Sequence, residues 1–195
     1  SMTDAAFALH ALSAPQALVG GEDPELERTQ LNGGSFYDCY ETSDGRWFSV
    51  GGLEPQFFMQ FCQAIGRPDL AGRGLAMAPE IVAEVKSGIA EAMKQKTFSE
   101  WQDIFAEIDS CTEPVLTLTE AISHPQIQAR NMVVDVPTPS GASQKQIASP
   151  FKFSVTQPEY RRTGGQLGEH TAEVLAEQGF SEQDIEALKK IDAIV

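Results

Sequence analysis

The sequence lacks any long apolar run, and no stretch of its 195 residues approaches the roughly 20 residues that a membrane-spanning helix needs. Cysteine is scarce: the three thiols are far apart and form no C-x-x-C pair, so we expect them to be reduced, partly buried small hydrophobes. The three histidines are equally scattered, and we find no metal-ligand spacing, phosphate-binding glycine loop or G-x-S-x-G motif. The sequence therefore shows no self-contained catalytic or metal site.

Basic residues are also few, with 14 lysines and arginines against 28 acidic residues and a formal net charge of −14. Such a surface repels phosphate backbones, which argues against nucleic acid as the main partner. The first residues, Ser1–Ala5, contain neither the basic nor the apolar part of a signal peptide, so we expect a cytoplasmic protein with no membrane partner. Because Ser1 before Met2 resembles the remnant of a cleaved tag, we expect the natural chain to extend further upstream.

The N-terminal half begins with an alanine-rich segment, Met2–Val19, which predicts a helix that Pro15 breaks or kinks. The polar, turn-rich residues Gly20–Gly34 predict a linker. Alternating aromatic and polar residues on either side of a Ser-Asp-Gly turn then predict a β-hairpin, and periodic apolar residues predict helices after it. The expected elements are strands Ser35–Thr42 and Arg46–Val50, helices Glu54–Ile65 and Pro79–Lys96, and a helix opened by a capping box of Thr97 and Glu100, with Trp101, Ile104, Phe105 and Ile108 as its buried stripe.

The C-terminal half predicts further short elements, and the whole pattern predicts an α+β fold: a small antiparallel sheet surrounded by helices, with helical arms at both ends. We expect a linker helix and loop over residues 1–32, a small α+β domain over 33–158, and a C-terminal linker with helices over 159–195. The expected elements are an extended piece at Cys111–Leu118, helices near Thr119–Ser123 and from His124 to Asn131, strands Met132–Val136 and Gln144–Ala148, and closing helices Gly168–Gln178 and Ser181–Ile191.

Four segments, in order along nearly the whole chain, carry a family resemblance. They are Gly33–Tyr40 with Thr42–Arg46; Val50–Phe57; Cys111–Leu116 with His124–Gln126 and Ala129–Arg130; and Leu167–Thr171 with Val174–Leu175 and Gly179–Ser181. With these segments the chain resembles the C-terminal part of the family III CoA-transferases. The Leu-Glu-Pro-Gln-Phe run that starts at Leu53 is most similar to the α-methylacyl-CoA racemases within that family.

The resemblance implies an enzyme that inverts the α-carbon of a 2-methylacyl-CoA by removing and returning a proton. It implies a histidine and an aspartate as the acid/base pair, both upstream of this chain, and neither a metal nor any cofactor besides the acyl-CoA substrate. Glu54 is the residue that the resemblance places in catalysis, as the acceptor that orients that histidine. Tyr37 and Leu53 are the expected substrate-binding residues. The implied partners are the missing N-terminal large domain and a second subunit in an interlocked homodimer.

Several candidate residues, Glu54 and Tyr37 among them, also have a purely structural interpretation. Glu54 precedes Pro55 at a helix start, where an acidic residue is favoured by the helix dipole alone. Tyr37 lies in a predicted strand, where aromatic residues usually pack. The arginines Arg130, Arg161 and Arg162 are the best local cations for a phosphate, although salt-bridged surface residues are the simpler interpretation.

Three classes of function remain open: a racemase, a transferase that moves CoA between carboxylic acids, and a non-enzymatic docking or dimerisation domain. The first two differ in whether an acceptor acid is required. We expect the chain by itself to be inactive, because the acid/base pair lies outside it.

Overall fold

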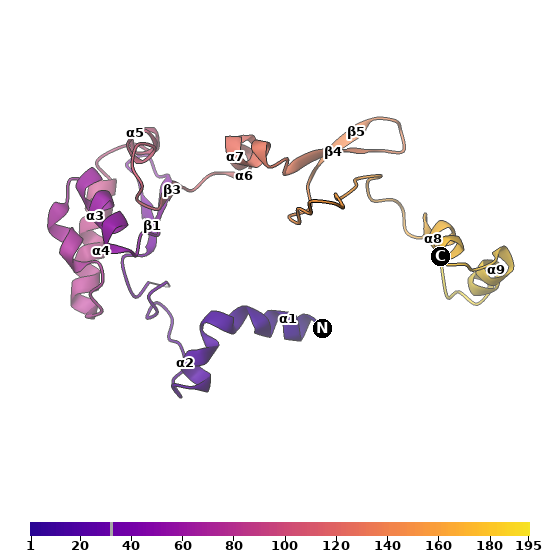
Figure 1. The fold of residues 1–195 in the computed structure, drawn as a ribbon, viewed down its shortest axis with the longest axis horizontal. Coiled ribbons are helices and arrows are strands. Elements are labelled where there is room, and N and C mark those ends of the chain that lie inside the picture. Colours follow the sequence, from indigo (N-terminus) through magenta and orange to yellow (C-terminus); the bar gives the residue numbers. More distant parts are fainter. Residues whose placement is uncertain (32) are drawn as a thin grey trace. The chain divides into compact units, whose positions relative to one another are not determined.

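The computed structural model describes residues 1–31 and 33–195, which form two compact units, residues 1–115 and 116–195 (Figure 1). Both units combine helices with a small antiparallel sheet, and helices lie at both ends of the chain, which confirms the α+β class. The strands do not form one sheet as expected, because among the described residues the hairpin of residues 133–147 pairs only with itself. The predicted linker Gly20–Gly34 includes Asn32, which lies outside the described residues. The predicted domain boundaries stay predictions.

The first unit has a three-stranded sheet in the order β1-β2-β3, with both pairs antiparallel. The helical turns before the sheet confirm the helix expected to break near Pro15. Its elements are α1 (Met2–Ala8), η1 (Leu9–Leu12), α2 (Ala14–Leu18), β1 (Asp38–Glu41), β2 (Trp47–Val50), α3 (Pro55–Ala64), η2 (Pro68–Arg73), α4 (Pro79–Met93), α5 (Phe98–Phe105) and β3 (Thr112–Pro114).

The hairpin between β1 and β2 forms where it was predicted. The backbone of Thr42 donates to the carbonyl of Arg46 at 2.7 Å, and Gly45 adopts the positive φ of +77° that the turn needs. The first strand, however, begins at Asp38 and not at Ser35. The Ser35 hydroxyl donates to the Gln30 carbonyl at 2.7 Å and accepts the Tyr37 N–H at 3.1 Å. These local bonds turn the chain before the strand begins.

One face of this sheet packs on helices through a cluster of aromatic rings. Phe105 on α5 lies 5.3 Å from the Phe48 ring of β2, 5.8 Å from Phe61 of α3 and 5.3 Å from Trp101, measured between centroids. The Trp101 indole N–H donates to the Met93 carbonyl at 2.7 Å, so the one polar atom of this ring is satisfied in the core. The capping box of Thr97 and Glu100, expected from the sequence, opens α5.

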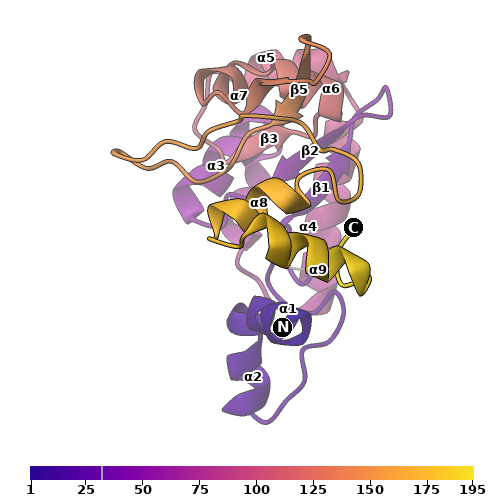
Figure 2. The ribbon, with the colours of Figure 1, turned by 90° about the vertical axis from the view of Figure 1, so that its right-hand side faces the viewer.

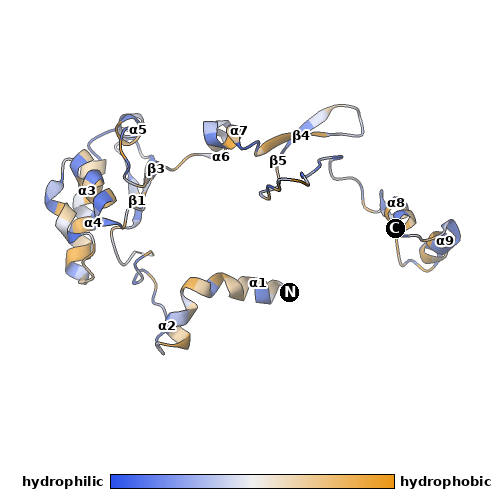
Figure 3. Cartoon of the chain, viewed as in Figure 1, coloured by the Kyte–Doolittle hydropathy of each residue, from blue (hydrophilic) through white to orange (hydrophobic). Residues whose placement is uncertain are grey.

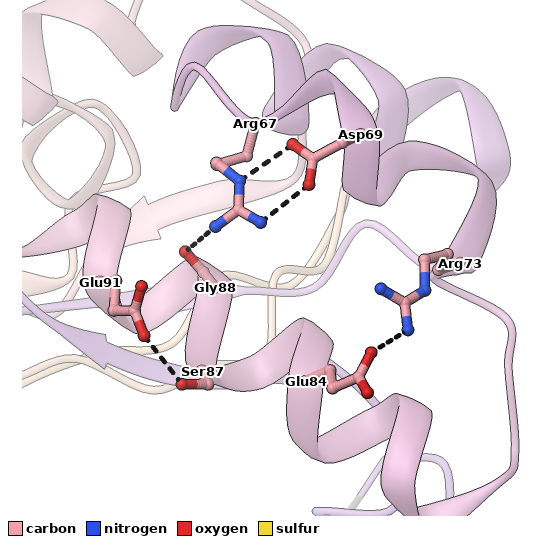
Figure 4. A network of polar contacts seen from close by, with 7 residues as sticks. All are labelled: Arg67, Asp69, Arg73, Glu84, Ser87, Gly88 and Glu91. Carbon is pink, nitrogen blue, oxygen red and sulfur yellow. Dashed lines mark hydrogen bonds and ion pairs between the residues drawn. The ribbon is translucent and has the colours of Figure 1, made fainter.

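A 3₁₀ helix that the sequence did not predict, η2, follows α3. Arg67 forms two hydrogen bonds with the Asp69 carboxylate, at 2.9 and 2.8 Å, and donates to the Gly88 carbonyl of α4 at 3.3 Å (Figure 4). Arg73 at the end of η2 pairs with Glu84 of α4. These contacts fix η2 against α4.

The second unit has a thin core. Among the described residues of this unit, the hydrophobic side chains that become fully buried are Val136, Ala148 and Ile185. Helices α8 and α9 lie side by side (Figure 2), and a capping box of Ser181 and Asp184 opens α9. The elements are α6 (Leu118–Ser123), α7 (Pro125–Ala129), β4 (Val133–Pro137), β5 (Ser143–Ile147), α8 (Thr171–Glu177) and α9 (Glu182–Lys190).

Large apolar side chains remain exposed on the N-terminal helices, which carry many apolar residues (Figure 3). Met2, Leu9 and Leu12 are 92%, 85% and 80% exposed. No side chain of α1 or α2 is buried within the described chain. Among the described helices, none has both the length and the apolarity to cross a lipid bilayer.

Candidate functional site

The candidate site lies where β2 ends and α3 begins. Strand β2 ends at Val50, and Gly51 and Gly52 turn the chain so that Glu54 becomes the N-cap residue of α3. The backbone of Glu54 is extended, with φ −67° and ψ 134°, and its carbonyl accepts the N–H groups of Phe57 and Phe58 at 3.0 and 3.1 Å. Pro55 occupies the first helical turn, where its missing N–H costs nothing.

The Glu54 side chain itself is exposed and does not cap its own helix. Within the described part of the chain, no hydrogen bond or ion pair engages its carboxylate. The helix dipole favours a negative charge at this position. The structure therefore presents an ionisable acceptor on a rigid helix start, available to a group outside the described residues.

Tyr37 lies just before the start of β1. Its half-buried ring lies against the backbone of Gly51, and it lines a cavity of about 350 Å³ together with Cys39, Ser49 and Cys111. A Cβ on Gly51 would lie only 3.2 Å from the Tyr37 ring, so glycine allows this close contact. Tyr37 is therefore not an ordinary core aromatic, because one side of it faces a cavity.

Glu54 lies near this cavity, whereas Leu53 lines a different one. Gly51 lines this cavity three residues before Glu54, and the negative charge of Glu54 contributes, after burial and Asp109, to raising the pKa of the Cys111 thiol. Leu53 lines a separate cavity of about 190 Å³ with Phe36. The structure thus does not bring Tyr37 and Leu53 into one pocket.

The cysteines do not form an activated nucleophile. All three are free, as expected, but Cys39 and Cys111 are exposed and only Cys62 is buried, so the expectation of partial burial is wrong for two of them. Burial, with a smaller contribution from Asp69, raises the pKa of Cys62 to about 12, and the pKa of Cys111 is raised as well. Raised pKa values keep a thiol protonated and unreactive at neutral pH.

The histidines and the C-terminal arginines have local structural roles. The Nδ1 of His124 accepts the N–H of Gln126 at the start of α7, and His170 lies beside Glu173. Arg161 and Arg162 pair with Glu159 and Glu173 at 2.6 and 2.8 Å, while Arg130 is exposed. The two ion pairs confirm the interpretation of Arg161 and Arg162 as salt-bridged surface residues. Among the described residues, no cluster of three or more His, Cys, Asp or Glu could hold a metal ion.

Two features of the site were missed in the sequence. Asp38 of β1 pairs with Lys86 of α4 at 2.7 Å beside the Tyr37 cavity. Partial burial opposes the ionisation of Asp38, but Lys86 and the N–H of Cys39 outweigh it and hold its pKa below the ordinary value. The second feature is the segment Ser110–Cys111, whose backbone touches the Gly51–Gly52 turn. Both features join residues that are distant in the sequence, so no local pattern indicates them.

Comparison with known proteins gives consistent results. The sequence pattern of CoA-transferase family III matches residues 1–171. The chain is 33% identical to the α-methylacyl-CoA racemase of Mus musculus over 162 residues, which is 80% of this chain and 40% of the racemase. It is 32% identical to the cinnamoyl-CoA:phenyllactate CoA-transferase of Clostridium sporogenes over 140 residues, which is 69% of this chain and 34% of the transferase.

The fold has relatives among solved structures. A CAIB/BAIF family protein from Brucella suis superposes with a TM-score of 0.65 at 22% identity, over 87% of this chain and 44% of that protein. In each comparison the chain spans less than half the length of its relative.

Proposed function

Since the chain belongs to CoA-transferase family III, we propose that it is the C-terminal part of an acyl-CoA enzyme that exchanges the α-proton of 2-methylacyl-CoA thioesters. The observation that carries this proposal is Glu54: an exposed carboxylate at a helix start, without a partner among the described residues, three residues after Gly51 in the wall of the Tyr37 cavity. The 33% identity to a racemase supports the same reaction.

The chemistry requires a base on one face of the α-carbon and an acid on the other. Removing the α-proton of a thioester gives an enolate, and returning a proton to the opposite face inverts the centre. An imidazole acts as such a base when its second nitrogen donates to a fixed acceptor, which sets the tautomer and raises the basicity. We propose that Glu54 is this acceptor for a histidine of the upstream lobe, and that it acts as a positioning residue.

Tyr37 and Leu53 have separate roles in the proposal. The Tyr37 cavity, at about 350 Å³, is large enough for one part of an acyl-CoA and not for the whole molecule. We assign Tyr37 to the part of the thioester that lies near Glu54. We assign Leu53 to substrate binding in its own smaller cavity, which Phe36 also lines.

We propose that the remaining surface docks on an upstream large domain and on a second subunit. The apolar side chains of α1 and η1 are almost fully exposed, as is Val155, which is 90% exposed in the second unit. Apolar surface of this kind usually marks an interaction site. An isolated chain without the acid/base pair is then inactive, and measurable turnover by the purified 195-residue chain would disprove this part of the proposal.

The second candidate is a CoA-transferase, favoured by the 32% identity to the Clostridium transferase. A transferase moves CoA between two carboxylic acids, whereas the racemase needs no acceptor acid. The third candidate is a docking or dimerisation domain without activity, which the exposed apolar side chains of α1 and η1 by themselves would explain.

The test uses the full-length parent enzyme with a 2-methylacyl-CoA in deuterated water, without any acceptor acid, and follows loss of the α-proton by NMR. We expect exchange with racemisation, and we expect Glu54→Gln to lower its rate about 100-fold, because the histidine loses a charged orienting partner. The matched control is Glu80→Gln, which changes an exposed glutamate near the start of a different helix, in the first turn of α4. If exchange fails but CoA transfer begins once a free carboxylic acid is added, the enzyme is a transferase.

A further inference from the structure

The Gly51–Gly52 turn is held by backbone contacts with the segment before β3. The N–H of Gly51 donates to the carbonyl of Cys111 at 2.9 Å, and the N–H of Leu53 donates back to the carbonyl of Gly51 at 3.0 Å. The turn is therefore tied to a segment that lies far away in the sequence. The turn is also short, so a shift in it would carry over to Glu54.

Gly52 makes the closest approach. A Cβ at this position would lie 2.7 Å from the carbonyl oxygen of Ser110 and 2.9 Å from the Cβ of Phe57, whereas ordinary van der Waals contact begins at 3.4 Å. The φ of Gly52 is not in the left-handed region, so its backbone conformation is open to alanine. Glycine is required here because of the Ser110 backbone and Phe57, and not because of its torsion angles.

The opposing segment is itself fixed. Ser110 is 2% exposed, and its carbonyl accepts the hydroxyl of Thr112 at 3.3 Å. Cys111 has a φ of +49°, an uncommon conformation for a side chain other than glycine. The contact with Gly52 is made by the Ser110 carbonyl oxygen, whereas the buried Ser110 hydroxyl has no hydrogen-bond partner among the described residues.

We propose that the Ser110–Cys111 backbone is the positioning element for Glu54, and that the close approach of Gly52 to it sets where the carboxylate lies. The inference rests on the proposed role of Glu54. Because Glu54 has no partner among the described residues that would hold it, its position depends on the start of α3 and therefore on the turn before it. An added methyl group on residue 52 must push the turn away from Ser110 and shift Glu54 with it.

The experiment compares Gly52→Ala, Glu54→Gln and the double variant in the full-length enzyme, with Gly164→Ala as the control. Gly164 has open space around it and no left-handed φ, so its substitution should leave turnover unchanged. We expect Gly52→Ala to lower kcat about 100-fold with little change in KM, as a displacement of about 1 Å can do. The double variant should be no slower than the slower single variant, because both changes remove the same interaction.

The outcomes separate the inference from the proposed function. If Glu54→Gln leaves exchange unchanged, the role of Glu54 is wrong and the inference falls with it. If Glu54→Gln slows exchange but Gly52→Ala does not, or if the two losses multiply in the double variant, the inference alone is overturned.

A second pair of variants decides the matter if Gly52→Ala does not fold. Cys111→Gly and Cys111→Val both remove the thiol, but only valine disfavours the left-handed backbone at this position. We expect Cys111→Val to lower kcat at least about tenfold more than Cys111→Gly, with the pH profile of the valine variant matching that of Glu54→Gln. Equal kcat values for the two variants would overturn the inference.

Discussion

The three thiols offer a direct test of the structure, because their environments differ strongly. Cys62 is 0% exposed and its pKa is raised to about 12 by burial and by Asp69, whereas Cys39 and Cys111 are exposed at the Tyr37 cavity. With this pKa, only about 10⁻⁴ of Cys62 is thiolate near pH 8, and the thiolate is the form that reacts. We expect alkylation of Cys39 first, of Cys111 more slowly, and of Cys62 not at all in the folded chain.

The assay is alkylation with iodoacetamide between about pH 7 and pH 10, followed by peptide mass spectrometry. The pKa of Cys111 is raised by burial and by the carboxylates of Asp109, Glu54 and Glu113, so its labelling should rise at a higher pH than that of a free cysteine. Glu54→Gln removes one of these charges and should move the Cys111 profile toward lower pH. Glu80→Gln, which is not among the causes of that shift, is the control.

Two results would refute this reasoning. Labelling of Cys62 at the rate of Cys39, in protein that circular dichroism shows to be folded, would contradict the burial of α3. If Glu54→Gln leaves the pH profile of Cys111 labelling unchanged, the Glu54 carboxylate does not act on the Cys111 thiol. That result would remove one support for placing the site at the Tyr37 cavity. Neither result depends on the reaction of the parent enzyme.

Two further predictions concern stability and association. Phe105→Ala removes a ring that contacts three other buried aromatics, so it should lower the free energy of unfolding of the first unit by about 3 to 5 kcal/mol. Tryptophan fluorescence measures this unfolding, because both tryptophans lie in the first unit. The control Phe153→Ala, at a position that is 59% exposed, should change the same free energy by less than about 0.5 kcal/mol. The double variant Leu9→Gln/Leu12→Gln should weaken the self-association of the isolated chain at least about tenfold, as measured by sedimentation velocity. Leu26→Gln, at an equally exposed position outside the helices, should not weaken it. Equal effects of the two changes would contradict docking through the N-terminal helices, residues 2–18.

Local chemistry predicted the fold where a single segment determines it. The capping box of Thr97 and Glu100 was predicted correctly, because both of its hydrogen bonds lie within four residues. The start of β1 was predicted three residues too early, because the Ser35 hydroxyl bonds the carbonyl of Gln30, which the strand pattern does not reveal. The helix η2 was missed because the contacts that fix it come from α4.

The candidate site was likewise predicted where a local segment determines it and missed where distant segments meet. The sequence and its resemblance indicated Glu54 and Tyr37, because Pro55 marks the helix start and each residue lies in one of the segments that carry the resemblance. The sequence could not show that Ser110 touches Gly52, nor that Leu53 and Tyr37 face different cavities. The first fact depends on how β3 returns beside β2, and the second on how η2 returns beside the start of α3, so both depend on tertiary contacts.

Under the proposed function, the electrostatics of the chain predict that the phosphates of an acyl-CoA bind outside these 195 residues. The net charge is −14, and Lys86 pairs with Asp38, which lines the Tyr37 cavity. A phosphate that displaced Asp38 from Lys86 would leave a partly buried carboxylate without its cation. The Tyr37 cavity therefore suits the uncharged, reacting end of a thioester better than its phosphates. This preference agrees with the proposed role of Glu54, which orients a catalytic group and does not bind a phosphate.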